Sequence, residues 1–399
     1  MYGDLQKMKS ELEVLRAKID LLDSKLIELF NERAKLVEQV GEWKTKNNKP
    51  ILDQSREAFI LNKIKSENLG PLSEASVLAL FQNIISIFRT WENERTLTHK
   101  ISQNFDVKEL AKKKIGILGL GLIGFSIALR LREILPNIEI FAYDIFNDET
   151  KNLIYAKDKK IIFLQNKNEI IKCDVIVLAT PINDVIDFIN NNKESLAKVD
   201  LVIDVCSTKK EVLEVAQGLK NFVGGHPLAG KEHAGPLFAD SNLFLNQIFV
   251  LSWYAEDSPS DLAQNYAHLL CQILGSKIRI CDPQLHDEEL ALTSHMVQLI
   301  STTLSKTSHE LLDQNKWNTE NLLFGPAYRE MMRLASSDFK IWNEIIKTNK
   351  ENIAKYIEVF DKNIQTIIVN LKNENSNKTR LWFESLFEMA KDFKIKVFK

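Results

Sequence analysis

The sequence is poor in cysteine, has no long apolar run and carries almost no net charge. Its 399 residues include four cysteines, which are scattered without a C-x-x-C pair or a ligand-like spacing to histidine. This pattern predicts a reduced, cytoplasmic chain and argues against disulfides and structural zinc. No apolar run approaches the ~20 residues of a membrane span, and the N-terminus lacks a charged-then-apolar signal. Lys plus Arg number 52 against 54 Asp plus Glu, so net charge recruits neither nucleic acid nor a membrane surface.

The length predicts two to three domains, and residues 114–124, KIGILGLGLIG, are the clearest motif. They predict a buried strand, a glycine-rich turn and a helix. Gly119 permits the tight turn, Gly121 the close approach of a pyrophosphate, and Gly124 close packing of the helix on the strand. The next predicted strand, residues 138–143, ends on Asp144, at the spacing of an acid that holds ribose hydroxyls. No basic residue lies within several positions of Asp144, which favours NAD over NADP.

Beyond this acid, short apolar segments alternate with helical stretches, which predicts a doubly wound α/β domain with a mainly parallel sheet. Ligands of such sheets bind outside the carboxyl ends of the strands. Thr180-Pro181 follows one such end and is predicted to border the nicotinamide; the alternative is an ordinary strand-ending proline. The further predicted strands are residues 161–164, 174–180, 201–205, 222–224 and 249–252. The predicted cofactor contacts are Gly119, Gly121, Leu122, Ile123, Gly124, Asp144, Thr180 and Pro181.

Residues 1–95 predict an all-helical module. Apolar residues recur every three or four positions from Leu12 to Val40, and no proline or glycine interrupts residues 5–40. One helix of about forty residues is therefore expected. At ~1.5 Å per residue it spans about 60 Å, which is too long for so small a module to cover alone. We expect a homodimer with intertwined helices; the alternative is a coiled coil that serves dimerisation only.

Arg33 occupies a position of this apolar seam where leucine or isoleucine belongs. A guanidinium there costs stability unless an anion meets it, so Arg33 predicts an anion site. At ~100° per residue, Lys44 falls within about 20° of Arg33 on the helix, whereas Arg16 falls roughly 100° away. Only the partner subunit's Arg16 is expected to reach the same pocket.

Two more helices are predicted, one that opens at residues 53–57 and one over residues 72–94, where Phe88 and Glu92 share a face. With these residues the module resembles the all-helical chorismate mutase family, in the version fused to prephenate dehydrogenase. The resemblance implies three helices and a domain-swapped dimer. The matching positions are Leu15, Arg16, Ala17, Lys18, Ile19, Asp20, Glu32, Arg33, Val40, Gly41, Glu42, Trp43, Lys44, Asp53, Arg56 and Glu57.

The resemblance implies that this module rearranges chorismate to prephenate, a unimolecular reaction that needs orientation and charge stabilisation but no nucleophile. A glutamate at position 92 donates a hydrogen bond only when protonated, so we predict a mutase favoured at mildly acidic pH. Phe88 stands where other members commonly carry serine, which removes a polar support. The implied roles are Arg33 and the partner subunit's Arg16 for the two carboxylates, Lys44 and Glu92 for the ether oxygen, and Asp53 for the hydroxyl, with Arg56 and Glu57 in support.

A shaped loop, residues 224–236, GGHPLAGKEHAGP, begins directly after a predicted strand. Alone, a histidine such as His226 is more often structural; at a strand end of a dinucleotide domain it is a candidate base. G-G-H-P-x-A-G is similar to the motif of prephenate and arogenate dehydrogenases. The resemblance implies that His226 takes the proton of the ring hydroxyl while NAD receives hydride and carbon dioxide leaves, giving 4-hydroxyphenylpyruvate. Ser207 is implied to orient His226, Lys209 is a weaker candidate, and activity is expected to fall at low pH as His226 becomes charged.

Residues 283–399 predict a mostly helical region whose segment 290–304, apolar nearly all round, is typical of a helix buried in a dimer. His295 and Gln298 share a face there. The family's usual S-H-x-x-H ends on Gln298 here, and both residues are implied to contact substrate. Arg333, four positions after Arg329, is implied to clamp a substrate carboxylate because a planar guanidinium suits one; Arg329 is the reserve. The alternative is a solvated or salt-bridged arginine.

These observations predict a multidomain chain: an all-α chorismate mutase module over 1–95, a linker over 96–112, an α/β Rossmann-type NAD domain over 113–282, and an all-α substrate and dimerisation domain over 283–399. The amphipathic tail, residues 380–399, is expected to pack on the partner subunit. We expect a bifunctional enzyme of tyrosine biosynthesis that takes chorismate and prephenate as substrates and NAD as cofactor, without a metal. The rivals are an arogenate dehydrogenase fused to a mutase, and a regulatory dimer that binds NAD without catalysis.

Overall fold

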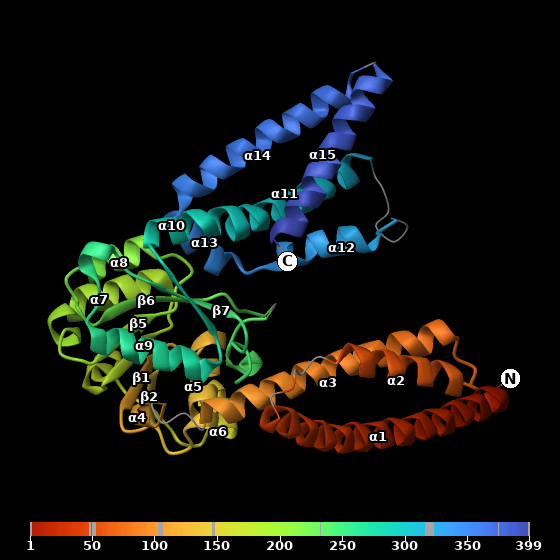
Figure 1. Cartoon of the computed structure of the whole chain (residues 1–399), viewed down its shortest axis with the longest axis horizontal. Coiled ribbons are helices and arrows are strands. Elements are labelled where there is room, and N and C mark those ends of the chain that lie inside the picture. The colour runs from red at the N-terminus through yellow and green to blue at the C-terminus, as the bar shows by residue number, and fades with distance from the viewer. Residues whose placement is uncertain are drawn as a thin grey trace.

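The computed structural model describes residues 2–47, 49, 53–102, 107–145, 148–231, 233–315, 323–373 and 375–397. Within these ranges the chain forms a helical N-terminal arm, a central α/β part and a C-terminal helical part, in the predicted order (Figure 1). None of the described helices is both long and apolar enough to cross a membrane. The predicted linker and tail include residues 103–106 and 398–399, which lie outside the described residues.

The N-terminal arm consists of α1 (Tyr2–Lys46), α2 (Gln54–Glu67) and α3 (Glu74–Ser102). The prediction of one long first helix is confirmed, and both α1 and α2 pack on α3 (Figure 1). Ile85 is the one buried hydrophobic side chain among those described between residues 12 and 92. The arm therefore leaves the apolar seam of α1 uncovered, and each of its members is about half exposed: Leu12, Leu15, Ile19, Leu22, Leu26, Leu29, Leu36 and Val40.

The central part is built on one eight-stranded sheet in the order β3-β2-β1-β4-β5-β6-β7-β8. Neighbouring strands pair in parallel except β6 and β7, so the predicted mainly parallel, doubly wound sheet is confirmed. The sequence analysis missed β8, because its segment KIRIC interleaves two basic residues with apolar ones at the sheet edge. The strands are β1 (Lys114–Leu118), β2 (Glu139–Tyr143), β3 (Ile161–Phe163), β4 (Val175–Leu178), β5 (Leu201–Asp204), β6 (Phe222–Pro227), β7 (Ile248–Ser252) and β8 (Lys277–Cys281).

Two hydrophobic cores lie on the two faces of this sheet. Helices α5 (Leu122–Ile134) and α9 (Asp261–Leu274) cover one face, and α7 (Ile182–Leu196) and α8 (Lys210–Ala216) cover the other. In β1, β2, β4, β5 and β6, neighbouring residues along the strand enter opposite cores, as the pleat requires. Short helices α4 (Val107–Leu110) and α6 (Asp148–Lys157) complete this part. The strand order reverses between β1 and β4, and α/β sheets bind ligands at such a switch point.

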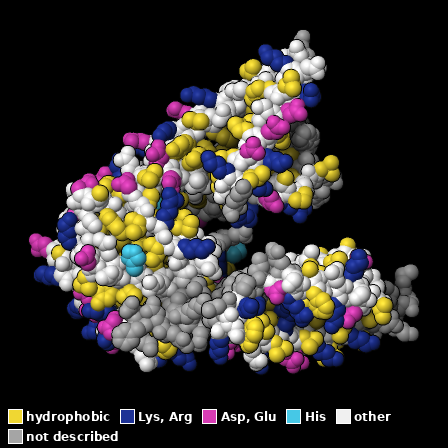
Figure 2. All heavy atoms as spheres, viewed as in Figure 1, with side chains coloured by type: hydrophobic (Ala, Val, Ile, Leu, Met, Phe, Trp, Pro, Cys, Tyr) yellow, Lys and Arg dark blue, Asp and Glu magenta, His cyan; other side chains and the backbone are white. Residues whose placement is uncertain are grey.

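The C-terminal part is helical, as predicted. A π-helical turn, Ala291–His295, joins α10 to α11. Helices α11 and α14 extend away from the sheet, and α15 runs back from the far end of α14 (Figure 1). Figure 2 shows hydrophobic side chains on the surface of this part and of the N-terminal arm. The helices are α10 (Pro283–Leu290), α11 (Met296–Asn315), α12 (Pro326–Arg333), α13 (Phe339–Thr348), α14 (Lys350–Leu371) and α15 (Ser376–Val397).

Candidate active sites

The first candidate site lies between α1 and α3. Lys44 Nζ is 2.8 Å from Glu92 Oε1, and only 15% and 8% of these side chains are exposed. The Arg33 guanidinium lies over the Phe88 ring, 4.1 Å from its centroid. Arg33 and Lys44 stand about three turns apart on α1, and Phe88 and Glu92 about one turn apart on α3. The two helices therefore bring together four residues that the sequence analysis singled out.

Arg33 is a half-buried cation that meets no anion among the described residues. Its Nη1 is buried and makes no hydrogen bond to any described residue. Burial lowers the pKa of Arg33, although a guanidinium stays charged at any physiological pH. The Phe88 ring offers a cation–π contact in place of a polar support. An unpaired buried donor is costly, and a carboxylate would relieve that cost.

Arg16 lies on the same helix but far from this site. At ~1.5 Å per residue, it stands about 25 Å from Arg33 along α1, and its side chain is exposed. One chain therefore does not bring Arg16 to Arg33, which agrees with the expectation that only the partner subunit's Arg16 can do so.

The remaining predicted residues of the arm surround the start of α2. Asp53 caps this helix: its Oδ1 accepts hydrogen bonds from Ser55 Oγ at 2.6 Å and from the Arg56 backbone N–H at 2.9 Å, and these bonds lower the pKa of Asp53. Glu57 pairs with Arg89 Nη1 at 2.9 Å, and the Arg56 side chain is exposed. Asp53 and Glu57 thus have structural partners, and a substrate contact for them stays a prediction.

The second candidate site begins at the glycine turn after β1. Gly119 has φ +95°, and a Cβ there would lie 2.6 Å from the Ala179 carbonyl oxygen. At Gly124 a Cβ would lie 2.0 Å from the Gly119 oxygen, whereas at Gly121, the N-cap of α5, it would meet nothing within 4 Å. The first and last glycines are therefore required by packing, and the middle one borders open space that a ligand can approach.

Asp144 lies beside this turn at the end of β2. Its Oδ2 accepts the Leu120 N–H and its Oδ1 the Ile145 N–H, each at 2.6 Å. Burial raises the pKa of Asp144, against the two N–H bonds that act to lower it. The carboxylate is held in place with lone pairs to spare, which suits hydroxyl donors and repels a phosphate.

A cleft of about 1150 Å³ opens in front of the turn. The cleft is lined by the glycine turn, Thr180-Pro181, Ser207, residues 229–231 and 233–235, and residues of the segment from Arg333 to Ile345. It lies at the carboxyl ends of β4 and β5, where the topology places ligands. Thr180 Oγ1 is buried and makes no hydrogen bond within the described part of the chain. This orphaned hydroxyl is a further sign that the cleft holds a polar ligand.

His226 lies on β6, next to the cleft but not among its lining residues. Its exposed fraction is 9%, and its Nδ1 is 2.9 Å from His286 Nε2. Burial, followed by the repulsion that His286, Lys209 and His295 exert when they carry a proton, lowers the pKa of His226 well below the usual range. Ala229, three positions after His226 in the chain, and Ser207, which follows the neighbouring strand β5, both line the cleft. The imidazole is therefore neutral and close to the ligand space, as a base must be.

Lys209, the weaker candidate, is fully buried and forms an ion pair with the Asp204 carboxylate. Asp204 also accepts the N–H groups of Cys206 at 2.9 Å and Gly225 at 3.1 Å. The pair thus ties the end of β5 to β6 just ahead of His226. Its geometry gives Lys209 a structural task.

His295 and Gln298 are buried and do not line the cleft. Burial lowers the pKa of His295 to about 4, and Asn349 Nδ2 lies 3.2 Å from His295 Nδ1. Gln298 Nε2 donates to the Leu334 carbonyl oxygen at 2.7 Å. Gln298 therefore fixes the turn that follows Arg333, and a direct substrate contact for either residue stays a prediction.

Of the two candidate arginines, Arg333 lines the cleft, whereas Arg329 is exposed outside it. Across the cleft, Glu344 of α13 accepts the Ile182 N–H at 2.6 Å and the Asn183 side-chain amide at 2.9 Å. Both donors lie in the first turn of α7. Glu344 thus joins the helical part to the α/β part, and the sequence analysis did not single it out.

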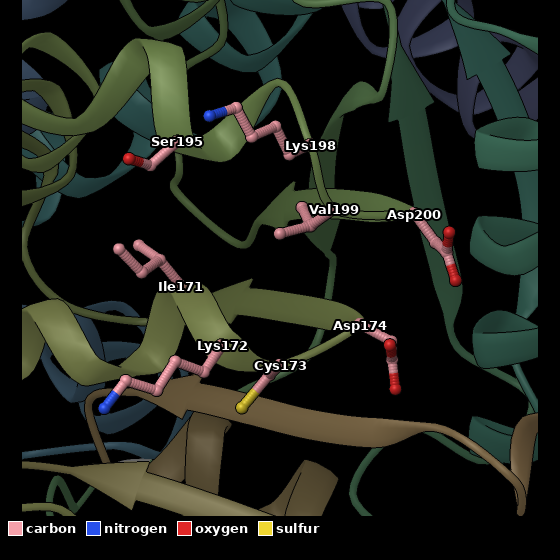
Figure 3. A pocket seen from close by; sticks show the side chains of 8 residues that line it. All are labelled: Ile171, Lys172, Cys173, Asp174, Ser195, Lys198, Val199 and Asp200. Atoms are coloured by element: carbon pink, nitrogen blue, oxygen red, sulfur yellow. The ribbon is translucent and has the colours of Figure 1, made fainter.

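A smaller hollow of about 310 Å³ lies at the opposite, amino ends of β4 and β5 (Figure 3). Asp174 accepts the Lys114 N–H at 2.8 Å, and Asp200 pairs with Lys113 Nζ at 2.8 Å. The two carboxylates of this hollow are thus engaged in holding the sheet edge. Since parallel sheets bind ligands at their carboxyl ends, the cofactor cleft is the other one.

Three family models match consecutive parts of the chain. Residues 15–93 match "Chorismate mutase type II", residues 127–277 match "Prephenate dehydrogenase, nucleotide-binding domain", and residues 282–385 match "Prephenate dehydrogenase, dimerization domain". The prephenate dehydrogenase of Lactococcus lactis subsp. cremoris is 33% identical over 281 residues, which cover 68% of this chain and 75% of that one. The chain belongs to the prephenate dehydrogenase family.

Within this family, the T-protein of Haemophilus influenzae is similar over nearly the whole length, with 26% identity over 93% of this chain and 92% of that one. The crystal structure of the Aquifex aeolicus prephenate dehydrogenase shares the fold, with a TM-score of 0.61, 24% identity, and coverage of 71% of this chain and 96% of that chain. The prediction of a chorismate mutase domain followed by the two prephenate dehydrogenase domains is confirmed.

For this family member, the sequence analysis missed the residues that link the two dehydrogenase domains. His286 and Asp287 of α10 contact the His226 region, and Asn349 Nδ2 donates to the Asp287 carbonyl oxygen at 2.7 Å. Leu285-His286-Asp287 stands in the sequence as a polar interruption before an apolar helix. The adjacent His286 and Asp287 were the feature of the sequence from which this link could have been predicted.

Proposed function

We propose that the two candidate sites catalyse consecutive reactions of tyrosine biosynthesis. The arm rearranges chorismate to prephenate, and the cleft oxidises prephenate with NAD to 4-hydroxyphenylpyruvate and carbon dioxide. The observation that carries this proposal is one chain that has both sites. In its chorismate mutase domain, the buried Nη1 of Arg33 has no hydrogen-bond partner among the described residues, and beside its nucleotide cleft lies a buried, neutral His226.

In the first reaction the protein orients chorismate and stabilises the charge that develops on the breaking ether bond. Arg33 is assigned a substrate carboxylate, because its Nη1 has no partner in the described structure. Lys44 and Glu92 are assigned the ether oxygen, and the substrate has to separate their 2.8 Å pair. The second carboxylate is assigned to the partner subunit's Arg16.

Exchange of Glu92 for glutamine tests the role of this acid. The carboxyl group of Glu92 can donate a hydrogen bond to the ether oxygen only when it is protonated, whereas the amide of glutamine can donate at every pH. We expect the mutase rate of the Glu92→Gln variant to be flat between about pH 5 and 8, while that of the native chain falls as pH rises. Chorismate loss measured across this range gives the result, with prephenate oxidation as the folding control. Parallel profiles for the two proteins would remove Glu92 from the ether site.

We infer a homodimer from the exposed apolar seam of the same N-terminal arm. The apolar seam of α1 is uncovered in a single chain, and burial of such a seam against a second copy is the usual way to stabilise it. The C-terminal match to a dimerisation domain supports a dimer as well. We assign the seam and the C-terminal helices to the interface, with the partner subunit's Arg16 completing the mutase site.

In the second reaction, the glycine turn, Asp144 and Thr180 hold NAD, which supplies the hydride acceptor. The fit rests on the open N-cap Gly121 and on the buried Thr180 hydroxyl without a partner in the described structure. His226 accepts the proton of the ring hydroxyl, and Ser207 orients that hydroxyl. Arg333 binds a carboxylate of prephenate.

Exchange of Arg333 for lysine tests the carboxylate clamp. Lysine keeps the charge but loses the planar two-point contact. We expect KM for prephenate to rise by about 10- to 100-fold, the range that one hydrogen bond to a charged group supplies. The dissociation constant of NAD is expected to stay unchanged. Arg329→Lys, four positions away and outside the cleft, is the matched control; an equal effect of both variants would contradict the assignment.

The experiment that tests the whole proposal uses one purified chain and two additions. Chorismate alone should disappear without NAD, and NADH should form once NAD is added. A regulatory dimer without catalysis predicts no loss of chorismate. Comparison of turnover on prephenate and on arogenate tests the remaining alternative, an arogenate dehydrogenase fused to a mutase. Prephenate is favoured because no acid follows directly after the His226 loop to meet an amino group.

A further inference from the structure

Three buried side chains form a hydrogen-bonded row that ends on the proposed base. His226 Nδ1 lies 2.9 Å from His286 Nε2, and His286 Nδ1 lies 2.8 Å from Asp287 Oδ1. His286 and Asp287 are only 1% and 2% exposed. The row links β6 of the nucleotide domain to α10 of the helical part, so it forms only in the folded, two-domain enzyme.

The direction of both hydrogen bonds in the row follows from Asp287, its last member. The Asp287 carboxylate already accepts the backbone N–H groups of Lys209 at 2.7 Å and Lys210 at 2.9 Å. A carboxylate that accepts two N–H groups is stabilised in its ionised form and has no proton to give. His286 Nδ1 must therefore be the donor to Asp287. In a neutral His286 the other nitrogen, Nε2, is then an acceptor.

An acceptor at His286 Nε2 requires a donor at His226 Nδ1. A neutral His226 that carries its proton on Nδ1 has a bare Nε2. This second nitrogen makes no hydrogen bond to the residues that the structure describes. It is therefore the one nitrogen of the pair that is ready to take a proton from a ligand.

We propose that His286 and Asp287 are positioning residues that hold His226 in its Nδ1-protonated tautomer, so that Nε2 is the nitrogen that accepts the proton of the prephenate hydroxyl. The inference rests on the proposed function and names which atom of His226 acts. Neither His286 nor Asp287 touches substrate in this scheme. Both act through the ring that they orient.

The overall reaction indicates that His286 and Asp287 orient His226 and do not carry its proton away. The prephenate dianion and NAD⁺ become the 4-hydroxyphenylpyruvate monoanion, carbon dioxide and NADH, with no net release of a proton. The hydroxyl proton passes to Nε2 as hydride leaves the ring carbon. It returns to the same oxygen when the carbon–carboxylate bond breaks and its electrons make the ring aromatic. The row therefore needs to stabilise a transient imidazolium, not to carry a proton away.

The rival arrangement is a doubly protonated His286. Its Nε2 would then donate to His226 Nδ1, and the proton of neutral His226 would lie on Nε2, where it blocks catalysis. The two charged groups next to these histidines already have partners. The Lys209 ammonium is paired with Asp204, and the Asp287 carboxylate has three N–H donors, one of them from His286. The second imidazole nearby, His295, has its pKa lowered to about 4 by burial and is neutral.

A pair of nearly isosteric variants separates positioning from packing. Glutamine at position 286 places an acceptor oxygen near the site of Nε2, whereas methionine has a similar shape and no such acceptor. We expect His286→Gln to keep kcat for prephenate oxidation within about tenfold, and His286→Met to lose about 10²-fold, with KM for prephenate and the dissociation constant of NAD unchanged in both. Mutase activity of the same chains controls for folding, and His268→Gln on α9 is the matched control.

The proposal is overturned if the methionine variant is as active as the glutamine variant, or if glutamine is as inactive as methionine while mutase activity and NAD binding persist. The tautomer can also be measured without substrate. The chain has seven histidines, so ¹⁵N-histidine labelling gives a sparse spectrum, in which a His226→Gln variant identifies the signal of interest. At about pH 8, above the ordinary histidine range, we expect a protonated Nδ1 and a bare Nε2.

A proton on Nε2 in that spectrum would reject the proposal whatever the activity. Conversely, a native chain that fails to oxidise prephenate would reject the proposed function, while the nitrogen signals would still report the tautomer. The two failures are thus separable.

Discussion

Replacement of His226 by asparagine is expected to lower kcat for prephenate oxidation by about 10²- to 10⁴-fold, the usual contribution of a general base. Asparagine can occupy the place of Nδ1 but has nothing to accept a proton at the place of Nε2. The contact with His286 is therefore retained in part while the base is lost. Stopped or continuous measurement of NADH from prephenate gives the result.

The same variant carries its own control. The mutase site lies on α1 and α3, away from β6, so chorismate rearrangement by the His226→Asn chain should match that of the native chain. NAD binding should also persist, because the glycine turn and Asp144 lie on other strands. Oxidation within tenfold of the native rate would show that another group takes the proton.

The native enzyme should also show the lowered pKa of His226 in its pH profile. Catalysis needs the neutral imidazole, and burial lowers the pKa of His226 well below the usual range. The neutral form therefore persists as pH falls through about 6.5, the ordinary histidine value. We therefore expect kcat/KM for prephenate to fall only at a pH below about 6.5.

Replacement of Arg33 by alanine is expected to lower the mutase rate by about 10²- to 10³-fold, as for the loss of one preorganised charge-stabilising donor. Its guanidinium lies over Phe88 with a buried Nη1 that has no partner among the described residues. The variant loses the cation–π contact with Phe88 but also removes a buried donor without a described partner, so we expect only a small change in stability. Chorismate loss measures the rate, and a thermal melt checks stability.

Lys35→Ala provides the matched control for this variant. Lys35 is exposed two positions further along α1, roughly 200° around the helix from Arg33, so its loss should leave rearrangement unchanged. Oxidation of added prephenate should be normal in both variants. A mutase rate within a fewfold of native for Arg33→Ala would dissociate this site from chorismate.

The local patterns were enough to predict the elements that carry both sites. The period of apolar residues predicted α1, and the glycine spacing predicted β1, the turn and α5. The amphipathic spacing placed Arg33 with Lys44 on one face. Each of these depends on residues within a few turns of one another, where geometry follows from backbone periodicity.

Contacts between distant segments could not be predicted in this way. The pairing of Lys44 with Glu92 and of His226 with His286 joins residues 48 and 60 positions apart. Periodicity says which face of a helix a residue occupies but not which segment will meet it. The edge strand β8 was missed for a related reason, because its basic residues hide the pattern of a buried strand.

Glu344 has a consequence for the orientation that a dinucleotide would take in the cleft. Two of the helices that begin at the carboxyl edge of the sheet, α5 and α7, start at the cleft, and either positive end could attract a diphosphate. The carboxylate of Glu344 already neutralises the first turn of α7, and a second negative group would be repelled there. Gly121 leaves the start of α5 without a side-chain cap. A bound dinucleotide would therefore place its diphosphate at α5 and its nicotinamide ring towards α7, in an orientation favoured by an acid from the other domain.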